Sequence, residues 1–206
     1  MHFIKGKHLI LTAIVLSSIM TACVSTPPFR DAAGKRLPDS IAVIEKVKLG
    51  GIDQWIFIRG ADIKRPLLLF LHGGPGSPET TMIRSLCPDL ERAFVVVHWD
   101  QRMSGKTFSK KTPVESITVE HYVQDTLELT AYLQKKFSRD RIYLMGHSWG
   151  SILGILTVRK NPAPFQAFIG IGQVVHQEEG EKLSCDFLRT SALKKGDKST
   201  LRKLDK

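Results

Sequence analysis

Residues 141–154 read RIYLMGHSWGSILG, and this stretch decides the fold. Its first five residues predict a buried strand, whereas residues 148–160 predict a helix that ends before Asn161-Pro162. Between them, Gly146-His147-Ser148-Trp149-Gly150 is a G-x-S-x-G turn in the strand-to-helix setting that this motif requires. Such a turn strains the serine backbone and lifts its hydroxyl to the start of the helix, so the sequence predicts that Ser148 is a nucleophile.

The two glycines of this turn have a steric reason. We expect side chains at Gly146 or Gly150 to collide with neighbouring backbone. A G-x-S-x-G pentapeptide arises by chance in roughly one chain in ten of this length, given ordinary glycine and serine usage. Its position between a strand and a helix therefore carries the prediction, and the pentapeptide alone does not.

A second motif follows an earlier apolar run. Residues 66–71, PLLLFL, read as a strand that is buried on both faces of a mostly parallel sheet. The run stops at the glycine-rich turn His72-Gly73-Gly74-Pro75-Gly76, which we expect the ring of His72 to order. Backbone N–H groups of such a turn can point at a shared oxygen, and together with the amide of Trp149 they predict an oxyanion hole.

The rest of the chain alternates strands and helices. Residues 118–137 carry apolar side chains at near-helical spacing, with Thr118 as the expected N-cap. Further strands are predicted over residues 93–98 and 165–171, and a hairpin with a Gly50-Gly51 turn over residues 41–59. Strands that alternate with helices imply right-handed crossovers and an α/β sheet.

Three motifs in this order resemble a known family. The turn at residues 72–76, Trp-Asp-Gln-Arg at residues 99–102 and Gly-His-Ser-Trp-Gly-Ser at residues 146–151 look like the proline iminopeptidase group of α/β-hydrolases. These are serine peptidases that release N-terminal residues, often proline. The resemblance runs from Ile41 to the chain end, and it implies the α/β-hydrolase fold.

The resemblance also implies residue roles. Ser148 would be the nucleophile, the amides of Gly74 and Trp149 would form the oxyanion hole, and the Asp100-Gln101-Arg102 segment would brace the loop that lines the site. One departure is Met103, which stands where the family usually has glycine, and we expect its larger side chain to distort that loop.

The catalytic acid and histidine of the family pattern are missing. A serine hydrolase of this fold takes its triad in the order Ser, acid, His. The only histidine after Ser148 is His176, and it precedes Asp186, Asp197 and Asp205, which is the wrong order. Residues 174–206 resemble the first helices of a cap domain, so we expect the hydrolase core to be truncated after about six strands. The acidic residues of this segment would bind the amine of a substrate in that family or form a charged helix face: Glu178, Glu179 and Glu181.

The N-terminus predicts export. Lys5 and Lys7 precede the apolar residues 9–20, which are too few for a membrane span and fit a signal sequence. The stretch ends Met20-Thr21-Ala22-Cys23, which resembles a bacterial lipobox with Cys23 as the lipidated residue. We expect a signal peptide over residues 1–22, a tether over 23–40, a hydrolase core over 41–173 and the start of a cap over 174–206.

Composition sets further bounds. The 206 residues carry 30 Lys+Arg against 20 Asp+Glu, a net charge of +10, but the basic residues are spread along the chain and no nucleic-acid motif is present. Three cysteines are too few and too scattered for a disulfide scaffold or a cysteine-rich metal site, and we expect Cys87 and Cys185 to be buried or incidental. We expect no cofactor and no metal.

Three functions stay open. The first is an exported, membrane-anchored serine hydrolase that acts on a peptide or small-molecule substrate, most simply an aminopeptidase for N-terminal proline or a small residue. The second is an esterase of the same fold. The third is a catalytically inactive, lipid-anchored remnant.

Overall fold

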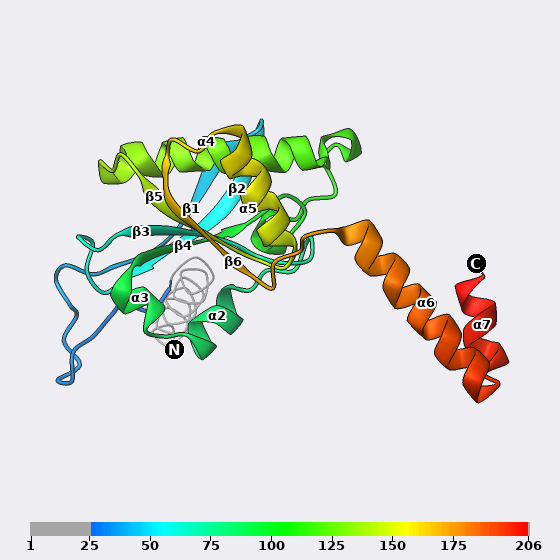
Figure 1. The fold of residues 1–206 in the computed structure, drawn as a ribbon. Coiled ribbons are helices and arrows are strands. Elements are labelled where there is room, and N and C mark those ends of the chain that lie inside the picture. Colours follow the sequence, from blue (N-terminus) through cyan, green and yellow to red (C-terminus); the bar gives the residue numbers. More distant parts are fainter. Residues whose placement is uncertain (1–25, 206) are drawn as a thin grey trace, which may run out of the picture. The chain divides into compact units, whose positions relative to one another are not determined.

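A computed structural model describes residues 26–205 (Figure 1). The chain divides between Gln173 and Val174 into two compact units, and each is described by itself. The expected signal peptide over residues 1–22 and the expected lipidation site Cys23 lie outside the described residues.

The first unit is built on a six-stranded sheet with the order β1-β2-β4-β3-β5-β6. Strands β1 and β2 form an antiparallel hairpin, β2 pairs antiparallel with β4, and the remaining pairs are parallel. The predicted α/β fold with an N-terminal hairpin and a mostly parallel sheet is confirmed. The strands are β1 (Ile41–Leu49), β2 (Ile52–Gly60), β3 (Leu67–Leu71), β4 (Val95–Asp100), β5 (Ile142–His147) and β6 (Phe165–Ile171).

Helices cover both faces of this sheet (Figure 1). On one face lie α4 (Val119–Phe137) and α5 (Trp149–Lys160), and on the other lie the short helices α2 (Thr80–Leu86) and α3 (Leu90–Ala93). Thr118 caps α4 as expected, because its side chain accepts a hydrogen bond from the backbone N–H of His121. The motif analysis did not predict α2 or α3. Two 3-10 turns, Gly105–Thr107 and Val114–Ser116, follow β4.

The core explains why β3 is apolar throughout. Successive side chains of a strand point to opposite faces, so a strand covered on both faces has no polar position. Leu67, Leu69 and Leu71 join the larger buried cluster, whereas Leu68 and Phe70 pack in a separate cluster with Val96. All five residues are at most 2% exposed.

The second unit consists of α6 (Gln177–Lys195) and α7 (Lys198–Leu204). Gly196 ends α6 in a left-handed conformation with φ 66°, and the Asp197 side chain begins α7 by accepting hydrogen bonds from Ser199 and Thr200 amides at 3.0 Å. Within residues 26–205, no helix is both long and apolar enough to cross a bilayer.

Candidate active site

Ser148 lies in the turn between β5 and α5, with backbone angles φ 52° and ψ −118°. A positive φ is uncommon for a residue other than glycine and costs on the order of 1–3 kcal/mol. The turn is held by hydrogen bonds: the Ser148 N–H donates to Ile171 O at 2.9 Å, and the Ser151 N–H and hydroxyl donate to Ser148 O. Ser148 therefore stands at the first turn of α5, where unpaired N–H groups favour developing negative charge.

The two glycines around Ser148 allow this turn. A Cβ on Gly146 would lie 2.1 Å from Gly150 O, and a Cβ on Gly150 would lie 2.1 Å from Leu71 O. Both distances are to backbone atoms, which no side-chain rotation relieves. The predicted collisions are confirmed, and the second one shows that α5 contacts the end of β3.

The glycine-rich turn that follows β3 lies against Ser148. A Cβ placed on Gly73 would be 3.3 Å from Ser148 Cβ. Gly74 has φ 114°, and a Cβ there would lie 2.7 Å from Gly76 N; the Gly74-Pro75 peptide is cis. The structure thus brings together the two motifs that the sequence analysis paired as nucleophile and oxyanion hole.

The His72 ring organises this turn from within. The ring is 2% exposed, its Nδ1–H donates to Gly73 O at 2.8 Å, and its Nε2 accepts from the backbone N–H of Gln101 at 3.3 Å. Nε2 also lies 3.0 Å from the Ser104 hydroxyl. Burial lowers the pKa of His72, so the ring stays neutral and keeps one donor and one acceptor.

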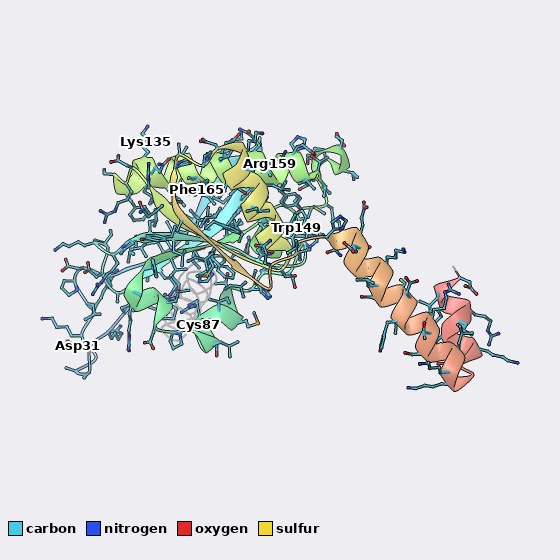
Figure 2. The ribbon with its side chains drawn as sticks, in the orientation of Figure 1. Asp31, Cys87, Lys135, Trp149, Arg159 and Phe165 are labelled. Atoms are coloured by element: carbon cyan, nitrogen blue, oxygen red, sulfur yellow. The ribbon has the colours of Figure 1, made fainter. Side chains whose placement is uncertain are left out.

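Gln101 connects the turn to the nucleophile elbow. Its Nε2 donates to His72 O at 3.1 Å, and its Oε1 accepts from Trp149 Nε1 at 3.2 Å. The Gln101 side chain is fully buried. Trp149, labelled in Figure 2, lies at the start of α5.

Both neighbours of Gln101 are anchored. Asp100 accepts a hydrogen bond from the Lys106 N–H at 2.7 Å, and burial raises the pKa of its carboxyl group. Arg102 pairs with both carboxylate oxygens of Asp125 on α4, and both side chains are 0% exposed. In a third hydrogen bond, Arg102 Nη2 donates to Gly50 O at 2.9 Å, at the tip of the β1–β2 hairpin. The segment therefore joins the hairpin, α4 and the site.

Met103 follows this segment in a left-handed conformation with φ 57°. The resembled family usually has glycine at this position, and the backbone gives the physical reason, because this region of φ favours glycine. The loop adopts the glycine-type conformation despite the larger side chain.

One pair beside Ser148 was not predicted. Glu79 Oε1 lies 2.7 Å from His147 Nδ1, and the second carboxylate oxygen of Glu79 is buried without a partner among the described residues. A Cβ on Gly73 would lie 3.0 Å from Glu79 Oε1 and 3.4 Å from His147 Nδ1, so the pair flanks the turn. The two residues are 68 positions apart, and no local pattern links them.

Within the described part of the first unit, residues 26–173, no histidine or carboxylate hydrogen-bonds the Ser148 hydroxyl. His121 is exposed on α4, and His98 is buried in β4 with both ring nitrogens unpartnered. In the second unit, His176 caps α6 by accepting from the Glu179 N–H at 3.2 Å. Glu178, Glu179 and Glu181 are exposed. Cys87 and Cys185 are also exposed, so of the two expected alternatives, buried or incidental, the structure excludes burial. In the part of the chain that the structure describes, no group of three His, Cys, Asp or Glu residues could hold a metal ion.

Comparisons with known proteins agree with this geometry. A family model described as alpha/beta hydrolase fold matches residues 66–191. A probable aminopeptidase of Bacillus subtilis, YbaC, is 43% identical over 150 residues, which cover 73% of this chain and 47% of that protein. A proline iminopeptidase of Thermoplasma volcanium is 29% identical over 123 residues, which cover 60% of this chain and 40% of that protein.

Solved structures show the same likeness. A proline iminopeptidase-related protein of Thermus thermophilus superposes with TM-score 0.54 and 28% identity, over 63% of this chain and 44% of that one. An epoxide hydrolase of Vigna radiata superposes with TM-score 0.56 and 25% identity, over 66% of this chain and 41% of that one. The chain spans less than half the length of the curated relatives that it matches. The resemblance inferred from the three motifs is confirmed, and the chain belongs to the α/β-hydrolase fold family.

Proposed function

We propose that this protein is a serine hydrolase of the aminopeptidase type, with Ser148 as its nucleophile. The observation that carries the proposal is the backbone of Ser148, which is held at φ 52° between two obligatory glycines and against the glycine-rich turn. A strained serine at a helix N-terminus, beside a glycine-rich turn, is an arrangement suited to acyl transfer.

In the proposed reaction, Ser148 Oγ attacks the carbonyl carbon of the substrate. The oxygen that becomes negative is received by the backbone N–H groups of Gly74 and Trp149. The C–N bond of the substrate then breaks, and the departing amine takes the proton that Ser148 gave to the catalytic base. Water, deprotonated by the same base, attacks the acyl-serine, releases the N-terminal residue as a carboxylic acid and returns the proton to Ser148. Serine is a weak nucleophile without a base, and an oxyanion hole with binding alone gives about 10³- to 10⁴-fold acceleration over water. The proposal therefore includes a histidine and a carboxylate that are supplied by polypeptide other than residues 26–205.

The substrate proposal rests on the relatives. The curated relatives are named aminopeptidase and proline iminopeptidase. We propose a peptide with a free N-terminal proline or small residue as the substrate, and cleavage after that residue.

The location proposal rests on the N-terminal sequence. Lys5 and Lys7, the apolar residues 9–20 and Cys23 after two small residues support export and lipid attachment to Cys23. Residues 23–40 would then hold the hydrolase near the membrane of the cell envelope.

A fluorophosphonate probe tests the catalytic part. The protein is purified from its own host, its intact mass is measured, and the labelled peptide is mapped. We expect labelling at Ser148, loss of labelling in Ser148→Ala, and unchanged labelling in Ser184→Ala, a control that removes an exposed serine of α6. The intact mass also shows whether the chain begins at a lipidated Cys23.

Substrates then test the specificity. We expect hydrolysis of proline and alanine naphthylamides, with at least about a 10³-fold loss in Ser148→Ala and no hydrolysis of the N-acetylated forms. No probe labelling of wild-type protein would contradict the proposal and favour an inactive remnant.

A second candidate is an esterase, because the fold also matches an epoxide hydrolase with TM-score 0.56. Hydrolysis of p-nitrophenyl esters without hydrolysis of naphthylamides would favour it.

A further inference from the structure

We propose that Gln101 is a positioning residue that fixes the two oxyanion-hole amides relative to each other. The inference rests on the proposed function, because that function assigns the hole to the amides of Gly74 and Trp149. Gln101 touches neither amide. It acts through His72 on one side and through the Trp149 indole on the other.

On the turn side, Gln101 sets the orientation of one peptide plane. Its backbone N–H donates to His72 Nε2, so the proton of the neutral ring is on Nδ1, and Nδ1–H donates to Gly73 O. Gly73 O and the N–H of Gly74 belong to the same planar peptide unit and point in opposite directions across it. Holding this oxygen therefore aims the Gly74 N–H.

The Gln101 side chain adds a second bond to the same residue, because its Nε2 donates to His72 O at 3.1 Å. His72 is the first residue of the turn, so two bonds from Gln101 hold its carbonyl group and its ring. Gln101 thus holds the turn at two points. One is the carbonyl group of His72, and the other, reached through the His72 ring, is the peptide between Gly73 and Gly74.

On the elbow side, Gln101 Oε1 accepts from Trp149 Nε1 at 3.2 Å. The indole also packs edge-on against Tyr122, with ring centroids 5.7 Å apart, and the Tyr122 hydroxyl donates to Arg102 O. Trp149 is the first residue of α5, and its backbone N–H is the second assigned donor. The side-chain contacts restrict rotation of this residue about its backbone.

Gln101 can serve as a reference point because it is itself immobilised. It is fully buried, and its carbonyl oxygen accepts from the Ser104 hydroxyl at 2.7 Å. The next residue, Arg102, is held by the buried carboxylate of Asp125. Since oxyanion stabilisation depends on donors that stand in place before the reaction, a small shift between the two amides lowers the rate more than it lowers affinity.

The chain offers a matched control for this proposal. Gln54 is also fully buried, its Oε1 accepts from Trp99 Nε1 at 3.0 Å, and its Nε2 donates to Leu49 O at 3.3 Å and to Asp125. Its partners do not belong to the turn or the elbow, but Asp125 also pairs with Arg102. Arg102 keeps both of its bonds to Asp125 when the Gln54 side chain is replaced, so this anchor of Gln101 stays in place. Gln101→Met and Gln54→Met therefore remove comparable hydrogen bonds in different places.

Two readouts test the proposal in the full protein. The first is hydrogen exchange of backbone amides in peptides that cover residues 72–76 and 148–152. The second is fluorophosphonate labelling of Ser148, separated into the maximal rate and the half-saturating probe concentration. For Gln101→Met we expect exchange to rise about 10-fold in both peptides and the maximal labelling rate to fall about 10- to 100-fold, with half-saturation unchanged within about two-fold. Gln54→Met changes neither peptide and leaves the maximal rate unchanged.

Trp149→Phe gives a second variant that keeps an aromatic ring and removes only the elbow bond. We expect faster exchange in residues 148–152 and unchanged exchange in residues 72–76. The proposal is overturned if backbone-amide exchange is unchanged in both Gln101→Met and Trp149→Phe. It is also overturned if Gln54→Met changes the exchange and the labelling rate as much as Gln101→Met does. If wild-type protein is not labelled, the proposed function fails, whereas the exchange readout still decides the role of Gln101.

Discussion

The two units of the molecule differ in whether they bury charged pairs. In the first unit, Arg102 and Asp125 are both 0% exposed, and Arg59 pairs with Glu91 at 2.9 Å with both side chains nearly buried. In the second unit, Arg189 and Asp205 form a pair at 2.8 Å, but their side chains are 45% and 61% exposed. The first unit also has exposed pairs, such as Arg92 with Asp89, but among the described residues the buried charged pairs all belong to this unit.

The units differ in their apolar side chains as well. The first unit has two buried clusters, whereas Ala192 is the one buried residue of α6 and α7. Leu183 and Phe187 on α6 are more than 60% exposed. The described contacts of the second unit are mostly local, namely helix caps and i,i+4 pairs. The geometry near Ser148 therefore depends on the buried network of the first unit.

The largest expected effect comes from breaking the buried pair. Asp125→Ala leaves the Arg102 charge buried and unpaired, so we expect the free energy of unfolding of the first unit to fall by about 3–5 kcal/mol. Asp205→Ala removes the exposed partner of Arg189 and should cost less than about 1 kcal/mol. Urea unfolding followed by tryptophan fluorescence measures the first unit, which contains Trp55, Trp99 and Trp149. Circular dichroism at the helix band measures the second unit, and similar losses in the two variants would refute the contrast.

The second prediction uses His98, a buried ring on β4 with no hydrogen-bond partner among the described residues. Burial, together with repulsion from Arg84 and Arg59, lowers the pKa of His98 to about 3. The unfolded chain protonates this ring near pH 6.5, whereas the folded protein keeps it neutral. The stability that this residue contributes is therefore complete above pH 6.5 and is lost as the pH falls from 6.5 towards 3.

Replacement of the ring tests this dependence. At pH 4.5 the wild type should have lost about 3 kcal/mol through His98, relative to pH 7.5. The ring centroids of His98 and Phe70 are 5.6 Å apart, so a leucine in place of His98 fits this apolar environment. The leucine of His98→Leu cannot be protonated. We expect the stability of this variant to fall less between these pH values in urea titrations. Equal pH slopes for the two proteins would show that His98 is not responsible.

The smallest effect concerns residues with left-handed backbones. Met103 in the first unit and Gly196 in the second have φ 57° and 66°. Glycine adopts this conformation without strain. We therefore expect Met103→Gly to raise the free energy of unfolding of the first unit by about 0.5–1 kcal/mol. For the same reason we expect Gly196→Ala to lower the helix content of the second unit. Calorimetry and circular dichroism measure these changes, and a destabilised Met103→Gly protein would mean that the side chain stabilises the loop.

The elements with strong local patterns were predictable from the sequence. The apolar run of β3 and the glycine turn of the hairpin appear within a few consecutive residues, and residues 165–171 form β6 as predicted. The need for glycine at position 146 follows from the local turn, because the collision there involves the backbone of Gly150, whereas the collision at Gly150 involves Leu71 O on β3.

Features that depend on distant residues were not predictable. Helix α2 has seven residues and α3 has four, which is too short for a helical period to stand out. Asp125 reads as one polar residue of an amphipathic helix, yet it holds Arg102 across 23 positions. Glu79 meets His147 only because the sheet order places β3 beside β5.

The same sheet order has a consequence for synthesis. β3 lies between β4 and β5, so this five-residue apolar strand has no neighbour when it leaves the ribosome. Its second partner, β5, begins at Ile142, and residues 72–141 must be made first. At translation rates of about 5–20 residues per second, that delay is roughly 4–14 s. For those seconds LLLFL is an unprotected edge in a nascent chain, and it is the segment that a chaperone would be expected to bind.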